Sequence, residues 1–305
     1  MTRRESTPPD DIDLRPATHD DYDDVVAFTT DTWDEQSDYI PRVYHDWIET
    51  NHSQTLVADA GDDIAGIAQV VMLSDYESWA QGMRVNSDFR GLGIGTTLTQ
   101  ALFDWAREQG AVVARNMVFS WNQAGLGQSR AVGFEPVTEF RWLQPDPTDE
   151  PVPASVTDNV DAAWTFWTAS EARTHLSGLA LDMDESWAMR DLTRQMLARA
   201  SDETALLVIS EGGTRAFAYR TRTVEREEEN GLETWAEYGV GAWTDLEAAD
   251  TLLAAISADA ATCGADRTRV LVPETPRVVS DGASLRADPS GHPDFVFAAD
   301  LTADH

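Results

Sequence analysis

The spacing of hydrophobic residues changes along this chain, and each spacing predicts either a helix or a strand. Residues 54–73 contain two apolar runs separated by the turn residues Gly61, Asp62 and Asp63, a pattern that predicts a β-hairpin. Residues 77–85 have a period of two, so we expect a strand whose alternate side chains share one face. The residues on that face are Glu77, Trp79, Gln81, Met83 and Val85.

The rest of the pattern before residue 144 mixes strands with helices. Strands are predicted at 12–15, 112–121 and 139–144. Helices are predicted after residue 15, where acids fill the first turn, from Pro41, across 94–110 and across 122–134. This succession predicts an α/β fold of the α+β type, with a mixed sheet.

A segment rich in proline and acidic residues divides the chain near its middle. Beyond it the order of elements repeats. Residues 235–264 match the span 79–110, each a strand followed by a long helix that ends in glycine, but the second copy has no glycine cluster between them. We therefore predict two domains of one fold, of which only the first keeps the glycine cluster. The predicted boundaries are a flexible N-terminus at 1–11, a first domain at 12–144, a linker at 145–158 and a second domain at 159–305.

The charge of the chain limits the kinds of partner that it can bind. There are 54 acidic residues against 22 basic ones, all arginine, and the net charge is -32. Because the acids are spread over both halves, they are typical of the solvated surface of a protein that works in high salt. We expect a halophilic, cytoplasmic protein with neither nucleic acid nor a membrane as partner.

The numbers and positions of the cysteine, the histidines and the apolar runs argue against a disulfide, a metal site and a membrane span. The single cysteine, Cys263, cannot form an intrachain disulfide, and its apolar surroundings predict a buried small side chain. No run approaches the roughly 18 apolar residues of a membrane span, and an export signal is not expected. None of the six histidines has metal-ligand spacing to another, so no metal site is predicted. The oligomeric state, a homodimer included, stays open.

Three glycines in five residues, Gly91, Gly93 and Gly95, join the strand at 77–85 to a long amphipathic helix. Glycines in this position let backbone N–H groups converge on an anion beside the positive end of the helix dipole, so they predict phosphate binding. A Walker loop needs a lysine after its last glycine, and this chain has none. A dinucleotide loop follows the first strand of a parallel unit and has glycine where Thr96 stands.

The run Arg90-Gly91-Leu92-Gly93-Ile94-Gly95 resembles the Arg/Gln-x-x-Gly-x-Gly/Ala pyrophosphate loop of the GNAT (Gcn5-related) N-acetyltransferases. The resemblance covers residues 12–144 and includes Asn122 and the pair Gly133-Phe134. It implies two GNAT-like domains, acetyltransferase activity, and acetyl-CoA (coenzyme A) as the acetyl donor.

The resemblance also implies roles for individual residues. Backbone amides of Leu92 to Thr96 would hold the pyrophosphate, and the backbone of Met83 to Val85 would pair with the pantetheine arm and help to polarise the thioester carbonyl. Asn122 would touch the cofactor near its thiol end. Glu77 is the candidate general base, acting on the acceptor amine through water, with a solvated surface acid as the alternative. The family's thiolate donor is a tyrosine, and Ser129, a weaker acid, occupies that position here.

Residues 38–48 and 77–85 also resemble the GNAT subgroup that includes histidine N-acetyltransferase, which implies a free amino acid or another small-molecule amine as acceptor. Four aromatic residues are candidates for the wall of the acceptor site, with core packing as the alternative: Trp33, Tyr39, Trp79 and Trp121. Two other functions stay open. One is a non-catalytic acyl-CoA-binding sensor or assembly module, and the other is acetylation of protein N-termini or lysine side chains.

Overall fold

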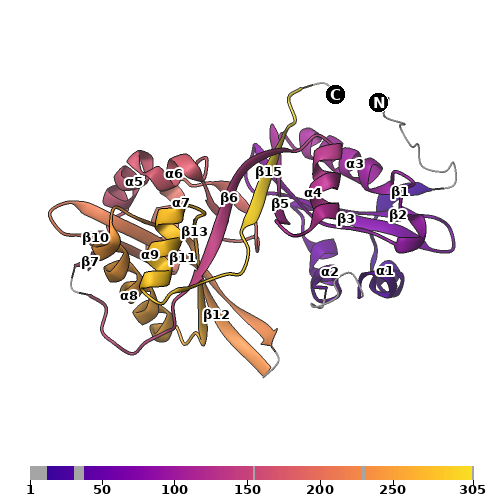
Figure 1. Ribbon diagram of the computed structural model, residues 1–305. Coiled ribbons are helices and arrows are strands. Elements are labelled where there is room, and N and C mark those ends of the chain that lie inside the picture. Colours follow the sequence, from indigo (N-terminus) through magenta and orange to yellow (C-terminus); the bar gives the residue numbers. More distant parts are fainter. Residues whose placement is uncertain (1–11, 31–37, 154, 229–230, 304–305) are drawn as a thin grey trace. The chain divides into compact units, whose positions relative to one another are not determined.

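The computed structural model describes residues 12–30, 38–153, 155–228 and 231–303 and divides into two compact units (Figure 1). Unit 1 comprises Met1–Asn116, Asn122–Pro136 and Phe297–His305, and unit 2 comprises Met117–Trp121 and Val137–Val296. The expected flexible N-terminus at 1–11 and the candidate Trp33 lie outside the described residues.

Unit 1 is a mixed sheet with helices on both faces. Strands follow the order β1-β2-β3-β4-β5, and all neighbours are antiparallel except β4 and β5. Helices α1 and α2 cover one face and α3 covers the other (Figure 1). This arrangement confirms the predicted α/β class with a mixed sheet. The elements are β1 (Asp13–Pro16), η1 (His19–Asp21), α1 (Tyr22–Thr29), α2 (Ile40–Glu49), β2 (Ser53–Asp59), β3 (Ile64–Met72), β4 (Glu77–Val85), η2 (Ser87–Phe89), α3 (Ile94–Glu108), β5 (Val113–Phe119) and α4 (Gln123–Ala131).

Helix α3 forms where the glycine run ends because its apolar residues recur at helical spacing. Ile94, Leu98 and Leu102 make one buried stripe against β2, β3 and β4. The helix ends before Gly110, which takes a positive φ of 101°. On the opposite face of the sheet, Val57 and Ile67 belong to a core cluster with residues of α1 and α2.

The last residues of the chain belong to unit 1. Phe297–His305 group with it, and the backbone N–H of Leu301 donates a hydrogen bond of 2.9 Å to the carbonyl of Val112. Arg107 of α3 donates through Nε to the carbonyl of Leu301, also at 2.9 Å. A segment from the far end of the sequence thus completes the sheet beside β5.

The strands of unit 2 also combine parallel and antiparallel pairing. The strand order is β6-β13-β12-β11-β10-β7, and all pairs are antiparallel except β12 and β13. Its longest helix, α8, packs against β10 to β13 and carries the core of the unit. The free Cys263 packs against this core and is partly buried, whereas the sequence predicted a buried side chain. The elements from residue 135 onward are β6 (Glu135–Gln144), β7 (Val156–Thr157), α5 (Val160–Ala169), α6 (Glu171–His175), β8 (Leu179–Leu181), β9 (Met189–Asp191), α7 (Arg194–Glu203), β10 (Ala205–Ser210), β11 (Thr214–Glu228), β12 (Gly231–Trp243), α8 (Leu246–Thr262), β13 (Arg267–Pro273), α9 (Pro276–Ser284), β14 (Asp288–Pro289) and β15 (Asp294–Asp300).

Each unit bends one strand at a glycine. In unit 1 the pairing of β3 with β4 slips by one residue around Gly82, and in unit 2 the pairing of β11 with β12 slips around Gly239. A Cβ atom at Gly82 would lie 2.4 Å from the indole of Trp47, and one at Gly239 would lie 2.2 Å from the ring of Tyr219. Both bulges therefore need a residue without a side chain.

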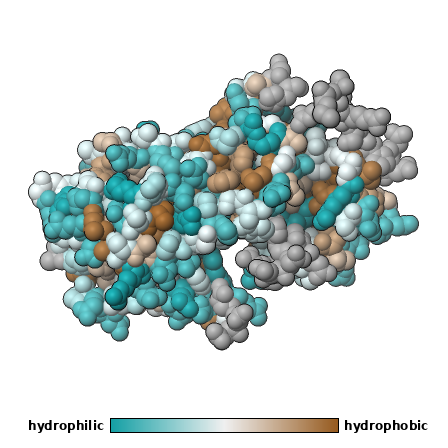
Figure 2. All heavy atoms as spheres, viewed as in Figure 1, coloured by the Kyte–Doolittle hydropathy of each residue, from teal (hydrophilic) through white to brown (hydrophobic). Residues whose placement is uncertain are grey.

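The surface of the molecule follows its composition. Hydrophilic residues cover most of the face shown in Figure 2. Within the described ranges, no helix combines the length and the apolar character needed to cross a membrane. The same residues contain no group of three or more histidine, cysteine or acidic side chains arranged to hold a metal ion.

The bulge at Gly82 gives a test of the fold. Gly82→Ala adds a methyl group against Trp47 at a φ of 65°, so it should cost about 3 kcal/mol of unfolding free energy from overpacking and backbone strain together. Gly61→Ala is the matched control, because Gly61 has a φ of 90° with nothing within 4 Å of its added Cβ, and it should cost only about 1 kcal/mol. Denaturant titration in molar salt measures both values. Equal losses would show that the contact with Trp47 does not constrain the bulge.

Candidate active site

Strands β4 and β5 separate after a short parallel ladder. Glu77 pairs with Val113, Ser78 with Ala114 and Trp79 with Arg115, and the described pairing stops there. Beyond these pairs β4 continues to Val85, and Ala80, Gln81, Arg84 and Val85 pair with β3. The end of a ladder between two parallel strands is a place where an extended ligand can pair with the backbone.

The bulge changes which residues of β4 share a face. Gln81 pairs with Gln69 and Arg84 pairs with Ile67, two positions on the same face of β3. Arg84 therefore continues the face of Glu77, Trp79 and Gln81, and the expectation that Met83 and Val85 lie on it is wrong beyond Gly82. A sequence reading with strict period two could not detect the extra residue.

The glycine loop leads straight into α3. Gly93 is the N-cap residue with a φ of 82°, and in the described structure no side chain caps this helix. The first N–H groups, up to Thr96, have no acceptor within the helix, because the first bond to close the turn runs from the N–H of Thr97 to the carbonyl of Gly93. Uncapped amides at the positive end of a 15-residue helix make an anion site that fits a pyrophosphate.

The other residues of the loop divide between the surface and the core. Gly91 is exposed with a φ of 80° and open space around it, and Leu92 is half-buried. Ile94 and Gly95 are buried instead, and a Cβ at Gly95 would lie 2.8 Å from the side-chain amide of Gln128 on α4. Gly95 therefore allows α3 and α4 to pack closely, a role that the loop motif did not predict.

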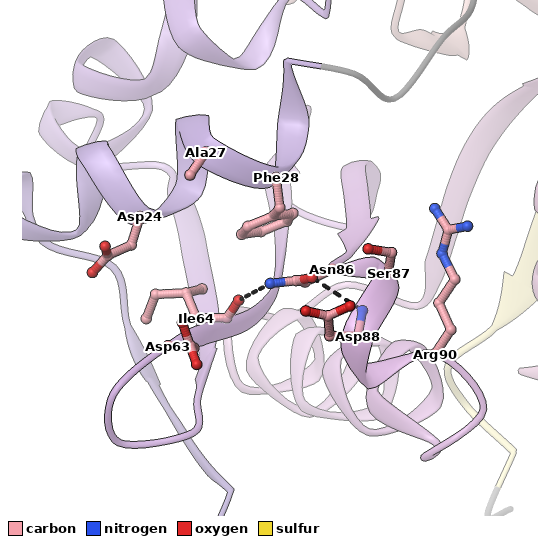
Figure 3. Close-up of a pocket in the computed structure, with 9 residues that line it drawn as sticks. All are labelled: Asp24, Ala27, Phe28, Asp63, Ile64, Asn86, Ser87, Asp88 and Arg90. Carbon is pink, nitrogen blue, oxygen red and sulfur yellow. Dashed lines mark hydrogen bonds between the residues drawn. The ribbon is translucent and has the colours of Figure 1, made fainter.

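Arg90 is exposed and lies on the rim of a cavity of about 370 Å³ (Figure 3). Asn86 fixes this rim, since its side chain donates to the carbonyl of Ile64 at 3.4 Å and accepts from the N–H of Asp88 at 3.2 Å. The lining carries three carboxylates and only one guanidinium, which disfavours a phosphate. The lining residues are Asp24, Ala27, Phe28, Asp63, Ile64, Asn86, Ser87, Asp88 and Arg90.

Glu77 stands where β4 and β5 are still paired. Its side chain is fully buried, and Oε1 lies 2.6 Å from Nη1 of Arg115 on β5. Ser74, in the turn before β4, donates to Oε2 at 2.9 Å. Glu77 is therefore part of a buried ion pair and is not a solvated surface acid, the alternative that the sequence left open. Sequence reasoning missed Arg115, because nothing local in the sequence marks a partner 38 residues away.

Asn122 and Ser129 both lie on α4. Asn122 caps this helix, accepting from the N–H of Gly125 through Oδ1 at 2.9 Å. Ser129 is buried and accepts a hydrogen bond of 3.0 Å from Nδ2 of Asn116 on β5. Asn116 is a second residue that sequence reasoning missed, and it connects the candidate thiolate donor to the strand that diverges from β4.

The candidate wall residues have different environments. Trp79 is buried in the core. The guanidinium carbon of Arg84 lies 5.6 Å from the ring centre of Tyr39. Arg84 also forms an ion pair with Asp38, in which Nε lies 2.6 Å from Oδ2. Trp121 is exposed and belongs to unit 2, where it stacks on Phe119. Of the candidates that the structure describes, Trp79 shares the face of β4 with Arg84, and Tyr39, the N-cap residue of α2, contacts Arg84.

In unit 2 a side chain caps the helix at the corresponding position. Its parallel strands β12 and β13 are connected by α8, whose N-cap is Asp245. Asp245 accepts from the N–H of Ala248 at 3.1 Å, and Arg215 lies 2.8 Å from the same carboxylate. The hydrogen bond from Arg215 lowers the pKa of Asp245 to about 2, so the helix end already has its anion.

Unit 1 thus combines a separating pair of parallel strands with an uncapped glycine loop, which together define an acyltransferase site of the GNAT type. The model of the acetyltransferase (GNAT) family matches residues 19–134, and this chain belongs to that family. It is an acetyltransferase, and acetyl-CoA is its acetyl donor.

Its relatives are enzymes of the same chemistry. The L-methionine sulfoximine/L-methionine sulfone acetyltransferases of Pseudomonas aeruginosa and Pseudomonas paraeruginosa are each 34% identical to it over 125 residues, which cover 37% of this chain and 70% of each relative. A GCN5-related N-acetyltransferase from Sphaerobacter thermophilus has the same fold, with a TM-score of 0.58, 18% identity and coverage of 97% of both chains.

A substitution at Gly93 tests the anion site. Gly93→Val places a β-branched side chain at a φ of 82° where the backbone must approach phosphate, so binding of acetyl-CoA should fall below detection. Gly61→Val is the matched control, since Gly61 has a similar φ of 90° but lies in the turn between β2 and β3. Titration calorimetry with acetyl-CoA measures binding, and unfolding curves confirm that both variants are folded. Equal affinity in the two variants would place the cofactor elsewhere.

Proposed function

We propose that this enzyme transfers the acetyl group of acetyl-CoA to the primary amine of a small molecule of the amino-acid class, by direct attack in a ternary complex. The observation that carries the proposal is the uncapped start of α3, which follows β4 beyond the end of its ladder with β5. The named substrates of the two Pseudomonas relatives, both amino-acid derivatives, support the class of acceptor.

We propose that residues 12–144 form the catalytic domain, that 145–158 link it to the rest, and that 159–305 form a degenerate GNAT-like domain without a cofactor of its own. The family match at 19–134 falls inside the first range, and the capped end of α8 supports the loss of a second anion site. The composition supports a halophilic enzyme in the cytoplasm.

The residues of unit 1 fit the cofactor. Bound acetyl-CoA supplies a thioester, an acetyl group that is activated toward amines. Amides of Leu92 to Thr96, with Arg90 at the head of the loop, would hold the pyrophosphate. The backbone of β4 at Met83 to Val85, beyond its ladder with β5, would orient the pantetheine arm and direct an N–H to the carbonyl oxygen on which negative charge develops.

Proton movement is assigned to two residues. Glu77 would take the amine proton through water, and Ser74, half-buried and hydrogen-bonded to its carboxylate, gives that proton a path to solvent. Ser129 would donate a hydrogen bond to the departing sulfur while Asn116 holds its hydroxyl in place. Asn122 would lie near the thiol end of the cofactor, fixed by its capping bond.

A panel of acceptors tests the proposed function. Purified enzyme in molar potassium chloride is given acetyl-CoA with single amino acids, methionine sulfoximine, polyamines or peptides, and the released thiol is detected colorimetrically. Amine-dependent release should appear with free amino acids or their derivatives and disappear in Gly93→Val. Binding of acetyl-CoA without release on any amine would favour a sensor, and release on peptides alone would favour protein acetylation.

Two variants test the assigned proton movements. Glu77→Gln keeps the shape and the contact with Arg115 but removes the base, so turnover should fall by about 10²- to 10⁴-fold, and the defect should shrink as rising pH deprotonates the amine. Ser129→Ala should cost only about tenfold, the scale of one hydrogen bond. Glu49→Gln, at an exposed acid on α2, is the control and should change nothing. Unchanged turnover and pH profile in Glu77→Gln would leave Glu77 with a structural role.

A further inference from the structure

Three arginines of unit 2 converge on one buried carboxylate. Glu237 on β12 stands opposite Arg222 on β11 and Arg269 on β13 in the strand register. Its Oε1 lies 2.7 Å from Nη2 of Arg226 and 2.5 Å from Nη2 of Arg269, and its Oε2 lies 3.9 Å from Nε of Arg222. Glu237 and Arg269 are both almost completely buried, with exposed fractions of 1% and 2%.

The charges in this cluster do not balance. One carboxylate faces three guanidinium groups, and the nearby Arg190 has its own partner in Asp182 at 3.4 Å. Burial lowers the pKa of Arg269 to about 9, and the charges of Arg226 and Arg222 act in the same direction against the attraction of Glu237. A chain with a net charge of -32 therefore buries an excess of positive charge at this place.

Asp294 is the other carboxyl that acts on Arg269. It accepts a hydrogen bond of 3.2 Å from the indole of Trp142, and burial raises its pKa to about 7. It is thus only partly ionised near neutral pH and cannot balance two guanidinium groups.

Several donors in the cluster have no acceptor. Within the described residues, Nε of Arg269, Nε of Arg222 and Nε1 of Trp235 are buried without a hydrogen bond. Nη2 of Arg269 has Oε1 of Glu237 at 2.5 Å as its ion-pair partner. A buried donor destabilises the fold unless an acceptor reaches it, and a charged donor does so most.

Aromatic rings lie beside the guanidinium groups. The guanidinium of Arg269 lies 4.2 Å from the ring centre of Trp142 and 4.0 Å from that of Trp187, and the guanidinium of Arg226 lies 5.0 Å from that of Trp235. The rings of Trp142 and Trp187 stand at 84° to one another with their centres 5.6 Å apart, so at most one of them can lie flat on the guanidinium of Arg269. A ring is only a weak acceptor for an N–H group, so an anion is the stronger acceptor for the donors that remain.

We propose that the cluster of Arg222, Arg226, Arg269 and Glu237 in unit 2 binds a small monovalent anion, either a halide or a carboxylate. The anion accepts from the unpaired N–H groups and brings the local charge close to balance. A phosphoanhydride is too highly charged for an excess of one to two positive charges. The site is independent of the acetyl transfer assigned to unit 1.

Replacing one anion by another at constant potassium tests the site. In molar potassium morpholinoethanesulfonate, whose anion is too bulky for a buried group, the sulfonate is exchanged stepwise for chloride or for acetate. Because three tryptophans line the cluster, their fluorescence and the midpoint of thermal unfolding should change along a saturating curve. Saturation with chloride alone, acetate alone or both supports the site and identifies the source of the anion.

Matched variants test whether the response to anions comes from this cluster. Arg226→Gln removes a donor whose side chain is 25% exposed and should raise the apparent dissociation constant by about tenfold or more. Arg267→Gln, on the same strand as Arg269 but with a side chain 52% exposed, makes the same change in charge. It should leave the apparent dissociation constant unaltered. Glu237→Gln increases the positive excess and should tighten binding, the opposite of a general loss of structure. A linear response, or the same constant in Arg226→Gln and Arg267→Gln, would overturn the proposal.

Discussion

The early end of the ladder between β4 and β5 is the constraint on which the active site depends. Three residue pairs join the strands, and β4 continues for six further residues after the last pair. The bulge at Gly82 adds to the separation, because one extra residue bends β4 and the indole of Trp47 occupies the space that a side chain would need. The ion pair of Glu77 with Arg115 joins the first pair of the ladder to the last, so it holds the two strands together over the part where they still meet.

Unit 2 repeats this geometry with a different helix end. It has the parallel pair and the glycine bulge, with Gly239 against Tyr219 in place of Gly82 against Trp47. The helix that connects its parallel strands is capped by Asp245, which accepts from the N–H of Ala248. The arrangement of strands depends on packing, whereas the chemistry available at the helix end depends on one side chain.

The parts of the site that could be predicted from the sequence are those with a local signal. Glycine spacing, the strand before it and the apolar stripe after it lie within 30 residues, and they located the loop at 90–95 and helix α3 correctly. Three features depend on strand pairing between distant segments and have no such signal: the partner of Glu77, the hydrogen bond from Asn116 to Ser129, and the return of residues 297–301 to unit 1. The bulge at Gly82 is marked in the sequence only by the glycine itself, and a strict period of two does not take it into account.

Arginine suits the buried cluster of unit 2 for a physical reason. A lysine in the place of Arg269 would lose its proton more easily under the same burial, and its ammonium group could not stack on an indole as a planar guanidinium can. The guanidinium stays charged at neutral pH even with a pKa lowered to about 9. Its charge must then be met by acceptors, and Glu237 alone does not meet the charge of three such groups. On the acidic surface an arginine finds carboxylates readily, so the shortage arises from burial and makes an external anion the remaining source of balance.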